Sequence, residues 1–120
     1  RCSQVYTAFF ESDGINITRL CEDRAVSTDL LFEDIKKLSA EKGEKIWLVG
    51  DGANLCYKKF GEEFVKTAPP QLLLGHASGT CIAAKRLYEN GETVTSAELV
   101  PNYLRLAQAE REKLQKEGKL

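Results

Sequence analysis

The sequence has 120 residues, with 17 lysines and arginines against 18 aspartates and glutamates, so its formal net charge is −1. A chain of this length fits a single domain with one core, residues 1–120. The balanced charge disfavours free-standing nucleic-acid binding, which needs an excess of basic residues. No apolar run approaches the roughly 20 residues that span a bilayer, and no charged-then-apolar leader opens the sequence. We therefore expect a cytoplasmic protein without membrane contact.

The first 20 residues have the pattern of a β-hairpin. Residues 5–10 alternate β-branched, small and aromatic side chains, and Ile15, Ile17 and Leu20 provide a second apolar run. Between the two runs, residues 12–14 (Ser-Asp-Gly) are typical of a turn. The strand pattern begins directly at Arg1 instead of at a methionine, so we expect the chain to be a piece of a longer protein.

A helix and a strand are predicted next. From Ser27 or Thr28 onward, apolar residues recur at helical spacing, acidic residues come early, lysines come late, and Gly43 follows. The helix face consists of Leu31, Ile35 and Leu38. Residues 46–49 (Ile-Trp-Leu-Val) are apolar at every position, which predicts a central, parallel strand covered on both faces.

The pattern then repeats more loosely. A short helix is predicted up to about Gly61, with Leu55, Tyr57 and Phe60 on its apolar side. Residues 64–68 predict a short strand that Pro69 and Pro70 stop. A second long helix has a face of small residues, which lets it lie close to its sheet or to another helix. That face comprises Ala77, Cys81, Ala84 and Tyr88, and Asn90-Gly91 ends the helix. The order of elements favours a three-layer α/β domain.

The four cysteines are Cys2, Cys21, Cys56 and Cys81, separated by long intervals with no C-x-x-C pair. Because His76 is the single histidine, a zinc site would have to be assembled from distant elements. We expect four free thiols and no metal. A Ser/His pair with His76 lacks the strained G-x-S-x-G turn of a hydrolase, so we expect a polar residue at a helix start.

One loop is a weak candidate for phosphate binding. Gly50, Asp51 and Gly52 follow a predicted strand, and glycines at such a position let backbone N–H groups approach a phosphate. The loop has Leu55 where a dinucleotide fingerprint has its third glycine, and no lysine completes a P-loop. Asp51 adds a repelling negative charge. We therefore expect a tight turn, no bound cofactor and no catalytic residue.

Three motifs together carry a family resemblance. They are the opening Arg1, Val5-Tyr6, Ala8 and Phe10, the central Val49-Gly50-Asp51-Gly52, and the closing Pro101-Asn102-Tyr103-Leu104-Arg105 with Ala109. In this order they resemble the second half of the TsaB (YeaZ) family over essentially all 120 residues. Gln4 stands where the family usually has glutamate.

The resemblance implies an actin-like, ribonuclease-H-like α/β lobe, with a mixed sheet flanked by helices and a C-terminal helix. The chain would be the C-terminal lobe of a two-lobe protein. TsaB-like proteins have no catalytic centre. They support TsaD, which holds the metal and transfers threonylcarbamoyl from an adenylate to adenosine 37 of certain tRNAs, with TsaE as the ATPase. Contacts with TsaD or with a second TsaB come mostly from the first lobe, so this lobe is expected to support them; a homodimer stays open.

Two other classes of function stay in view. One is a lobe of an enzyme, either TsaD-like (the glycoprotease type) or another actin-like ATPase. The other is an independent module that binds a nucleotide or a protein. Upstream sequence would separate them, because a His-x-x-x-His pair or phosphate loops would indicate catalysis.

The closing segment carries an expectation about stability. Tyr103 and Leu104 follow Pro101, which stiffens the chain, so we expect them to dock onto the lobe. Tyr103→Ala would then cost ~2–4 kcal/mol of stability. The mixed charges of residues 110–119 predict a solvated helix face, which should fray beyond Arg111.

Overall fold

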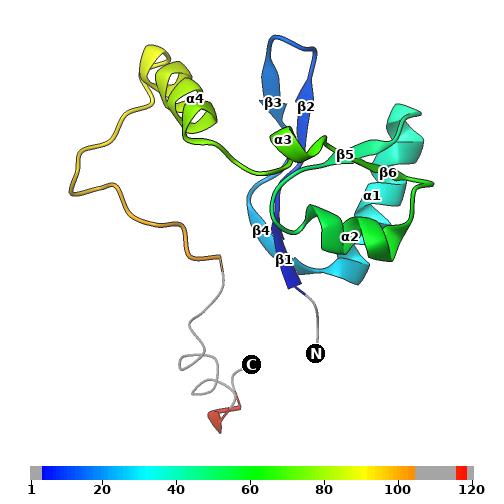
Figure 1. Ribbon diagram of the computed structural model, residues 1–120. Coiled ribbons are helices and arrows are strands. Elements are labelled where there is room, and N and C mark those ends of the chain that lie inside the picture. The colour runs from blue at the N-terminus through cyan, green and yellow to red at the C-terminus, as the bar shows by residue number, and fades with distance from the viewer. Residues whose placement is uncertain (1–3, 105–115, 119–120) are drawn as a thin grey trace. The chain divides into compact units, whose positions relative to one another are not determined.

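A computed structural model describes residues 4–104 and 116–118 (Figure 1). These residues form two compact units. The helical unit is Ser27–Leu99, and the ribbon unit is Gln4–Val26 together with the segment that starts at Val100. The motif residues Arg1, Arg105 and Ala109 lie outside the described residues, as do Cys2 and most of the charged segment 110–119.

The ribbon unit contains four short strands that pair two by two. They are β1 (Gln4–Thr7), β2 (Phe10–Ser12), β3 (Ile17–Arg19) and β4 (Arg24–Ser27), of which the last residue belongs to the helical unit. β1 pairs with β4, and β2 pairs antiparallel with β3. Between the two pairs, the N–H of Leu20 donates to the carbonyl oxygen of Phe9 at 2.8 Å. The predicted hairpin is therefore confirmed, but its first strand is divided into β1 and β2. The sequence pattern did not predict β4.

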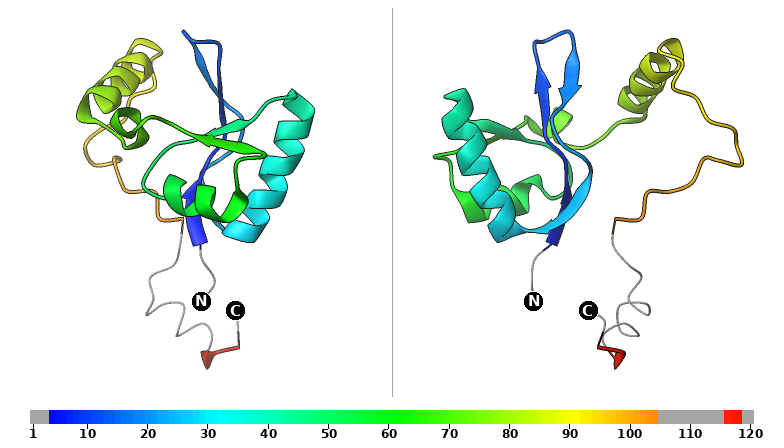
Figure 2. Two further views of the ribbon diagram at one scale, coloured as in Figure 1. Left: turned by 45° about the vertical axis from the view of Figure 1, so that its right-hand side comes forward. Right: turned by 180° about the vertical axis from the view of Figure 1, so that it is seen from behind.

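The helical unit alternates helices and strands. In chain order these are α1 (Thr28–Lys42), β5 (Ile46–Leu48), α2 (Ala53–Phe60), β6 (Val65–Thr67), α3 (Pro70–Leu73) and α4 (Ala77–Glu89). β5 and β6 run parallel, and Figure 2 shows α1 and α2 beside them. Both of these helices contact β5, and α2 also contacts β6. The described chain is thus a mixed α/β fold with three two-stranded sheets.

Local sequence signals explain both ends of α1. The Ser27 side chain accepts a hydrogen bond from the N–H of Leu30 at 3.2 Å, which caps the first turn. At the other end, Gly43 adopts a left-handed conformation with φ of +70° and donates its N–H to the carbonyl oxygen of Ser39. The predicted helix is therefore confirmed with its boundaries.

The core of the helical unit lies where α1, α2 and the strand pair meet. Its buried side chains are Thr28, Leu31, Ile35, Ala53, Cys56, Phe60 and Val65. Phe32 stacks on Phe60 with ring centroids 4.8 Å apart and meets Phe64 edge-on at 5.9 Å. Lys59 of α2 reaches α1, where its Nζ lies 2.6 Å from both Thr28 Oγ1 and Asp29 Oδ1. The aromatic cluster and this polar link hold the two helices together.

Two expectations about burial are wrong. Trp47 is 58 % exposed, and β5 pairs with β6 alone in the described chain, so β5 is neither central nor covered on both faces. On α2, the buried face is Ala53, Cys56 and Phe60, whereas Leu55 is 53 % exposed. In both segments apolar residues occupy several faces, so composition alone does not say which face packs.

α4 has the predicted limits, but its packing differs from the expectation. No residue of α4 is buried, and Tyr88 is 74 % exposed. The small-residue face therefore does not lie against the sheet in this structure. α3, for which the sequence pattern gives no prediction, begins at Pro70, where proline's missing N–H costs no helix hydrogen bond.

Candidate functional site

The turn of the β2–β3 hairpin is ordered by one carboxylate. Asp13 Oδ1 accepts hydrogen bonds from the backbone N–H groups of Ile15 at 2.8 Å and Asn16 at 2.6 Å, and Oδ2 accepts from Asn16 Nδ2 at 3.0 Å. Gly14 supplies the positive φ of +94° that the turn requires. The hydrogen bonds from Asn16, and then that from the N–H of Ile15, lower the pKa of Asp13 from 3.8 to about 2. The folded turn therefore favours the ionised form of the Asp13 carboxyl group.

This pKa predicts how the hairpin responds to pH. Because the pKa is lower in the folded state, the ionised carboxylate stabilises the hairpin above pH 3.8, and this stabilisation is lost as the pH falls through about 2. We expect Asp13→Ala to lower the urea midpoint at pH 7, with a difference from wild type that narrows below pH 4. A difference that persists unchanged at pH 2 would show that the carboxylate is not its source.

One face of this hairpin presents apolar side chains to solvent. The register pairs Phe10 with Arg19 and Ser12 with Ile17, so these four side chains share a face, which we call the hairpin face. Phe10 is 52 % exposed and Ile17 is 62 % exposed. The Arg19 guanidinium carbon lies 4.6 Å from the Phe10 ring centroid, within cation–π range. The hairpin face is therefore a small apolar surface with one positive charge.

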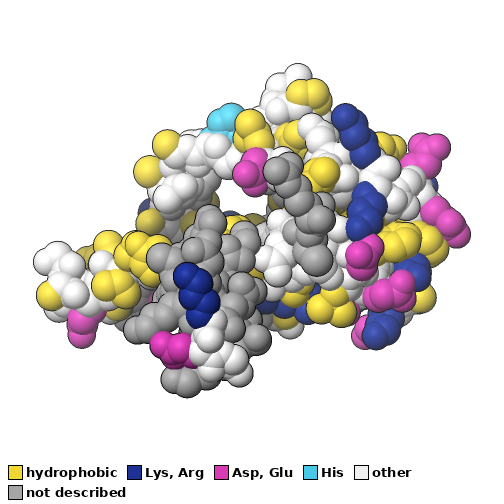
Figure 3. Space-filling model, turned by 90° about the horizontal axis from the view of Figure 1, so that it is seen from below, with side chains coloured by type: hydrophobic (Ala, Val, Ile, Leu, Met, Phe, Trp, Pro, Cys, Tyr) yellow, Lys and Arg dark blue, Asp and Glu magenta, His cyan; other side chains and the backbone are white. Residues whose placement is uncertain are grey.

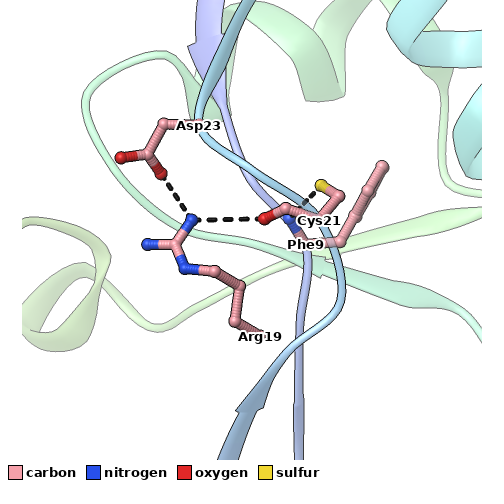
Figure 4. Close-up of polar contacts among 4 residues, drawn as sticks. All are labelled: Phe9, Arg19, Cys21 and Asp23. Atoms are coloured by element: carbon pink, nitrogen blue, oxygen red, sulfur yellow. Dashed lines mark hydrogen bonds and ion pairs between the residues drawn. The ribbon is translucent and has the colours of Figure 1, made fainter. Parts of the chain in front are cut away.

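The Arg19 guanidinium also contacts Cys21 and Asp23 (Figure 4). Its Nη1 lies 2.6 Å from Asp23 Oδ1 and 3.2 Å from the carbonyl oxygen of Cys21. The Cys21 Sγ in turn accepts the N–H of Phe9 at 3.2 Å. The hydrogen bond to Asp23 raises the pKa of Arg19 above its usual value. Sequence reasoning missed this arrangement, because the Phe10–Arg19 pairing depends on strand register.

The Gly50–Gly52 loop has the geometry of a strand-to-helix turn. Gly50 has φ of +98°, which favours glycine, and its carbonyl accepts the N–H of Ala53 at 3.2 Å. Its own N–H donates to the carbonyl oxygen of Leu73 at 2.6 Å. A backbone donor that a phosphate cradle would use is therefore already engaged. Asp51 is exposed beside it.

His76 and the three described cysteines have separate surroundings. His76 occupies the N-cap of α4, and its Nε2 lies 2.8 Å from the carbonyl oxygen of Gln71. Cys21, Cys56 and Cys81 are unpaired, and burial raises the pKa of the Cys56 thiol. Within residues 4–104 and 116–118, no three His, Cys, Asp or Glu side chains are grouped to hold a metal. The count of four thiols stays a prediction, to be checked by titrating the unfolded chain.

Three further motif residues, Tyr6, Pro101 and Tyr103, are exposed. Tyr6 on β1 is 66 % exposed, and Pro101 is exposed. Tyr103 is 83 % exposed, whereas Leu104 is partly buried. The expectation that the Tyr103 ring docks on the lobe is therefore wrong in this structure, and Tyr103→Ala should change stability by no more than about 0.5 kcal/mol, the range of surface substitutions.

Surface charge shows no concentration of one sign on the face in Figure 3, where basic and acidic side chains are interspersed and hydrophobic side chains also reach the surface. Among the described helices, none combines the length and the apolar character needed to cross a bilayer. Comparison of the chain with protein-family models, curated proteins and solved structures finds no match. The hairpin face is the candidate site that the geometry describes best.

Proposed function

We propose that this chain is a non-catalytic scaffold lobe of the TsaB type, which supports TsaD in the threonylcarbamoylation of tRNA adenosine 37. The three sequence motifs carry the resemblance, and their order along the chain is that of the family. The parallel β5–β6 pair with α1 and α2 beside it is compatible with an actin-like lobe. In this proposal the partners are TsaD and TsaE, and the protein acts in the cytoplasm.

The observation that carries the proposal is the hairpin face. Phe10 belongs to the opening motif of the resemblance, and it lies on this face beside Ile17. Exposed apolar groups on an ordered scaffold are typical of protein–protein contacts, because burying them removes apolar surface from water. Arg19, which forms an ion pair with Asp23, adds a polar guanidinium group at the edge of this apolar surface. A protein partner therefore fits this surface better than a small metabolite does.

A reconstituted modification reaction tests the function. The protein that contains this lobe is combined with TsaD, TsaE, threonylcarbamoyl adenylate and tRNA, and the modified nucleoside is measured by mass spectrometry. We expect modification to fall to background when the protein is omitted. Transfer of threonylcarbamoyl by this lobe without TsaD would contradict the scaffold role.

A matched pair of variants tests the site. The double variant Phe10→Ser with Ile17→Ser should slow modification several-fold, because it removes the apolar contact while Arg19 stays in place. Leu55→Ser is the control, since Leu55 is 53 % exposed on α2 and so similar in exposure to Phe10 at 52 %. Equal urea midpoints would show that both variants are folded. Equal rates of modification would mean that the hairpin face is not a partner contact.

Nucleotide titration addresses the alternative of an ATP-binding module. The Gly50 N–H already donates to the carbonyl oxygen of Leu73, so it is not available to a phosphate. We therefore expect no tight binding of ATP with Mg²⁺ in a calorimetric titration. A dissociation constant near or below ~1 μM, about −8 kcal/mol, would favour the nucleotide-binding alternative instead.

A further inference from the structure

The C-terminal end of α4 carries the sequence Asn90-Gly91, a pair of residues prone to loss of the asparagine amide. In this reaction the backbone nitrogen of the following residue attacks the side-chain carbonyl carbon. Glycine in that position allows the attack best, because it has no side chain to obstruct the approach. The other asparagines of the chain precede isoleucine, leucine and tyrosine, whose side chains hinder the attack; they are Asn16, Asn54 and Asn102.

The structure protects these other asparagines to different degrees. Asn16 Nδ2 donates to Asp13 Oδ2 at 3.0 Å in the ordered hairpin turn. Asn54 lies in α2, whose hydrogen-bonded backbone resists the change of dihedral angles that ring closure needs. Asn102 is exposed and lies in neither a helix nor a strand, so its protection comes from its bulky neighbour Tyr103. Asn102 is therefore the internal control for a reaction at the end of α4.

A Schellman motif closes α4 and engages the attacking nitrogen. Gly91 N–H donates to the carbonyl oxygen of Tyr88 at 3.0 Å, and Glu92 N–H donates to that of Leu87 at 2.9 Å. Gly91 has the positive φ of +77° that this cap requires. While both hydrogen bonds hold, the backbone of Asn90 stays near its helical conformation, with φ of −83° and ψ of 0°. Deamidation therefore requires this last turn to open.

The last turn of α4 has little to hold it closed. α4 has 13 residues, and none of them is buried in the described chain. An isolated helix of this length is marginal in water, because most helices owe their stability to a packed apolar face. An apolar residue after the cap glycine often reinforces a Schellman motif, but here that residue is the exposed Glu92. The Lys85–Glu89 ion pair is also exposed, and such pairs add little stability.

We propose that Asn90 is a site of spontaneous deamidation, which unwinds the C-terminal turn of α4. The Gly91 nitrogen attacks Asn90 Cγ and loses its proton, the bond from Cγ to the amide nitrogen breaks, and ammonia leaves as a succinimide ring closes. Water then opens the ring at either carbonyl carbon and gives aspartate or isoaspartate. This inference does not rest on the proposed function.

Both products weaken the end of the helix. Each places a negative charge at the C-terminus of α4, where the helix macrodipole disfavours it. Isoaspartate also lengthens the backbone by a methylene group, which displaces the Gly91 and Glu92 N–H groups from the carbonyl oxygens that they reach in the cap. The helical content of the chain should therefore fall as the reaction proceeds.

Peptide mapping by mass spectrometry tests the reaction on the full chain. The chain is incubated in mildly alkaline buffer, and the deamidated fraction of each asparagine is followed over time. We expect Asn90 to react many-fold faster than Asn102, and within several-fold of its rate in a peptide of residues 86–95, which is too short for a stable helix. Gly91→Ala should slow the reaction many-fold because its Cβ hinders the nitrogen, although it also weakens a cap that needs positive φ.

Circular dichroism tests the structural consequence. Asn90→Asp imitates one product and should lower the helical signal relative to Asn90→Gln, which keeps an amide. Equal signals from these two variants would overturn the unwinding. The site itself would be refuted if Asn90 reacted no faster than Asn102, or if it stayed intact while the peptide reacted, which would mean that the cap stays closed. An unchanged or faster reaction in Gly91→Ala would contradict attack by the Gly91 nitrogen.

Discussion

Replacing Phe60 with alanine should lower the free energy of unfolding by ~3–5 kcal/mol. Phe60 is 6 % exposed, and its ring stacks on Phe32 at 4.8 Å. Truncation removes the stacked pair and leaves a cavity between α1 and α2, where neighbouring side chains already pack closely. Urea midpoints at constant m-value measure the loss.

Leu55→Ala is the control for this substitution, because it lies on the same helix but is 53 % exposed. The sequence pattern places Leu55 and Phe60 on one apolar side of α2, whereas the structure buries only Phe60. We expect Leu55→Ala to cost no more than ~0.5 kcal/mol. Comparable losses from the two variants would mean that Leu55 packs against something and that the buried face of α2 is assigned wrongly.

Ile35→Ala should be the second large effect, with a loss of ~2–5 kcal/mol. Ile35 has no exposed surface and lies on the inner side of α1. The graded variant Ile35→Val removes one methyl group and should cost ~0.5–1.5 kcal/mol. The loss is larger for alanine than for valine because alanine leaves the larger cavity.

Leu30→Ala serves as the matched control for Ile35, since Leu30 is on α1 and 50 % exposed. The two substitutions differ in helix propensity by no more than about 0.7 kcal/mol, so a larger difference in stability reports packing. If Leu30→Ala destabilised the protein as much as Ile35→Ala, the helix itself and not the core would control stability.

Some features of the protein could be predicted from sequence because short-range contacts determine them. Ser27 and Gly43 bound α1 through hydrogen bonds to residues three or four positions away. The turn at Asp13 is equally local, since the carboxylate bonds within the next three residues. Pro69 and Pro70 end the β6 segment because proline lacks the N–H that a ladder needs. Such signals are present in the chain before any tertiary packing.

Other features were decided only by tertiary structure. The apolar run around Trp47 is compatible with a strand covered on one face or on both, and only the packing of helices shows which. The pairing of Phe10 with Arg19 depends on strand register. A shift of one residue would end this pairing and turn the side chains of the shifted strand to the opposite face. The buried face of α2, with Phe60 inside and Leu55 outside, likewise depends on contacts with residues far away in sequence. Burial is a property of neighbours brought together by folding, whereas caps and turns are properties of consecutive residues.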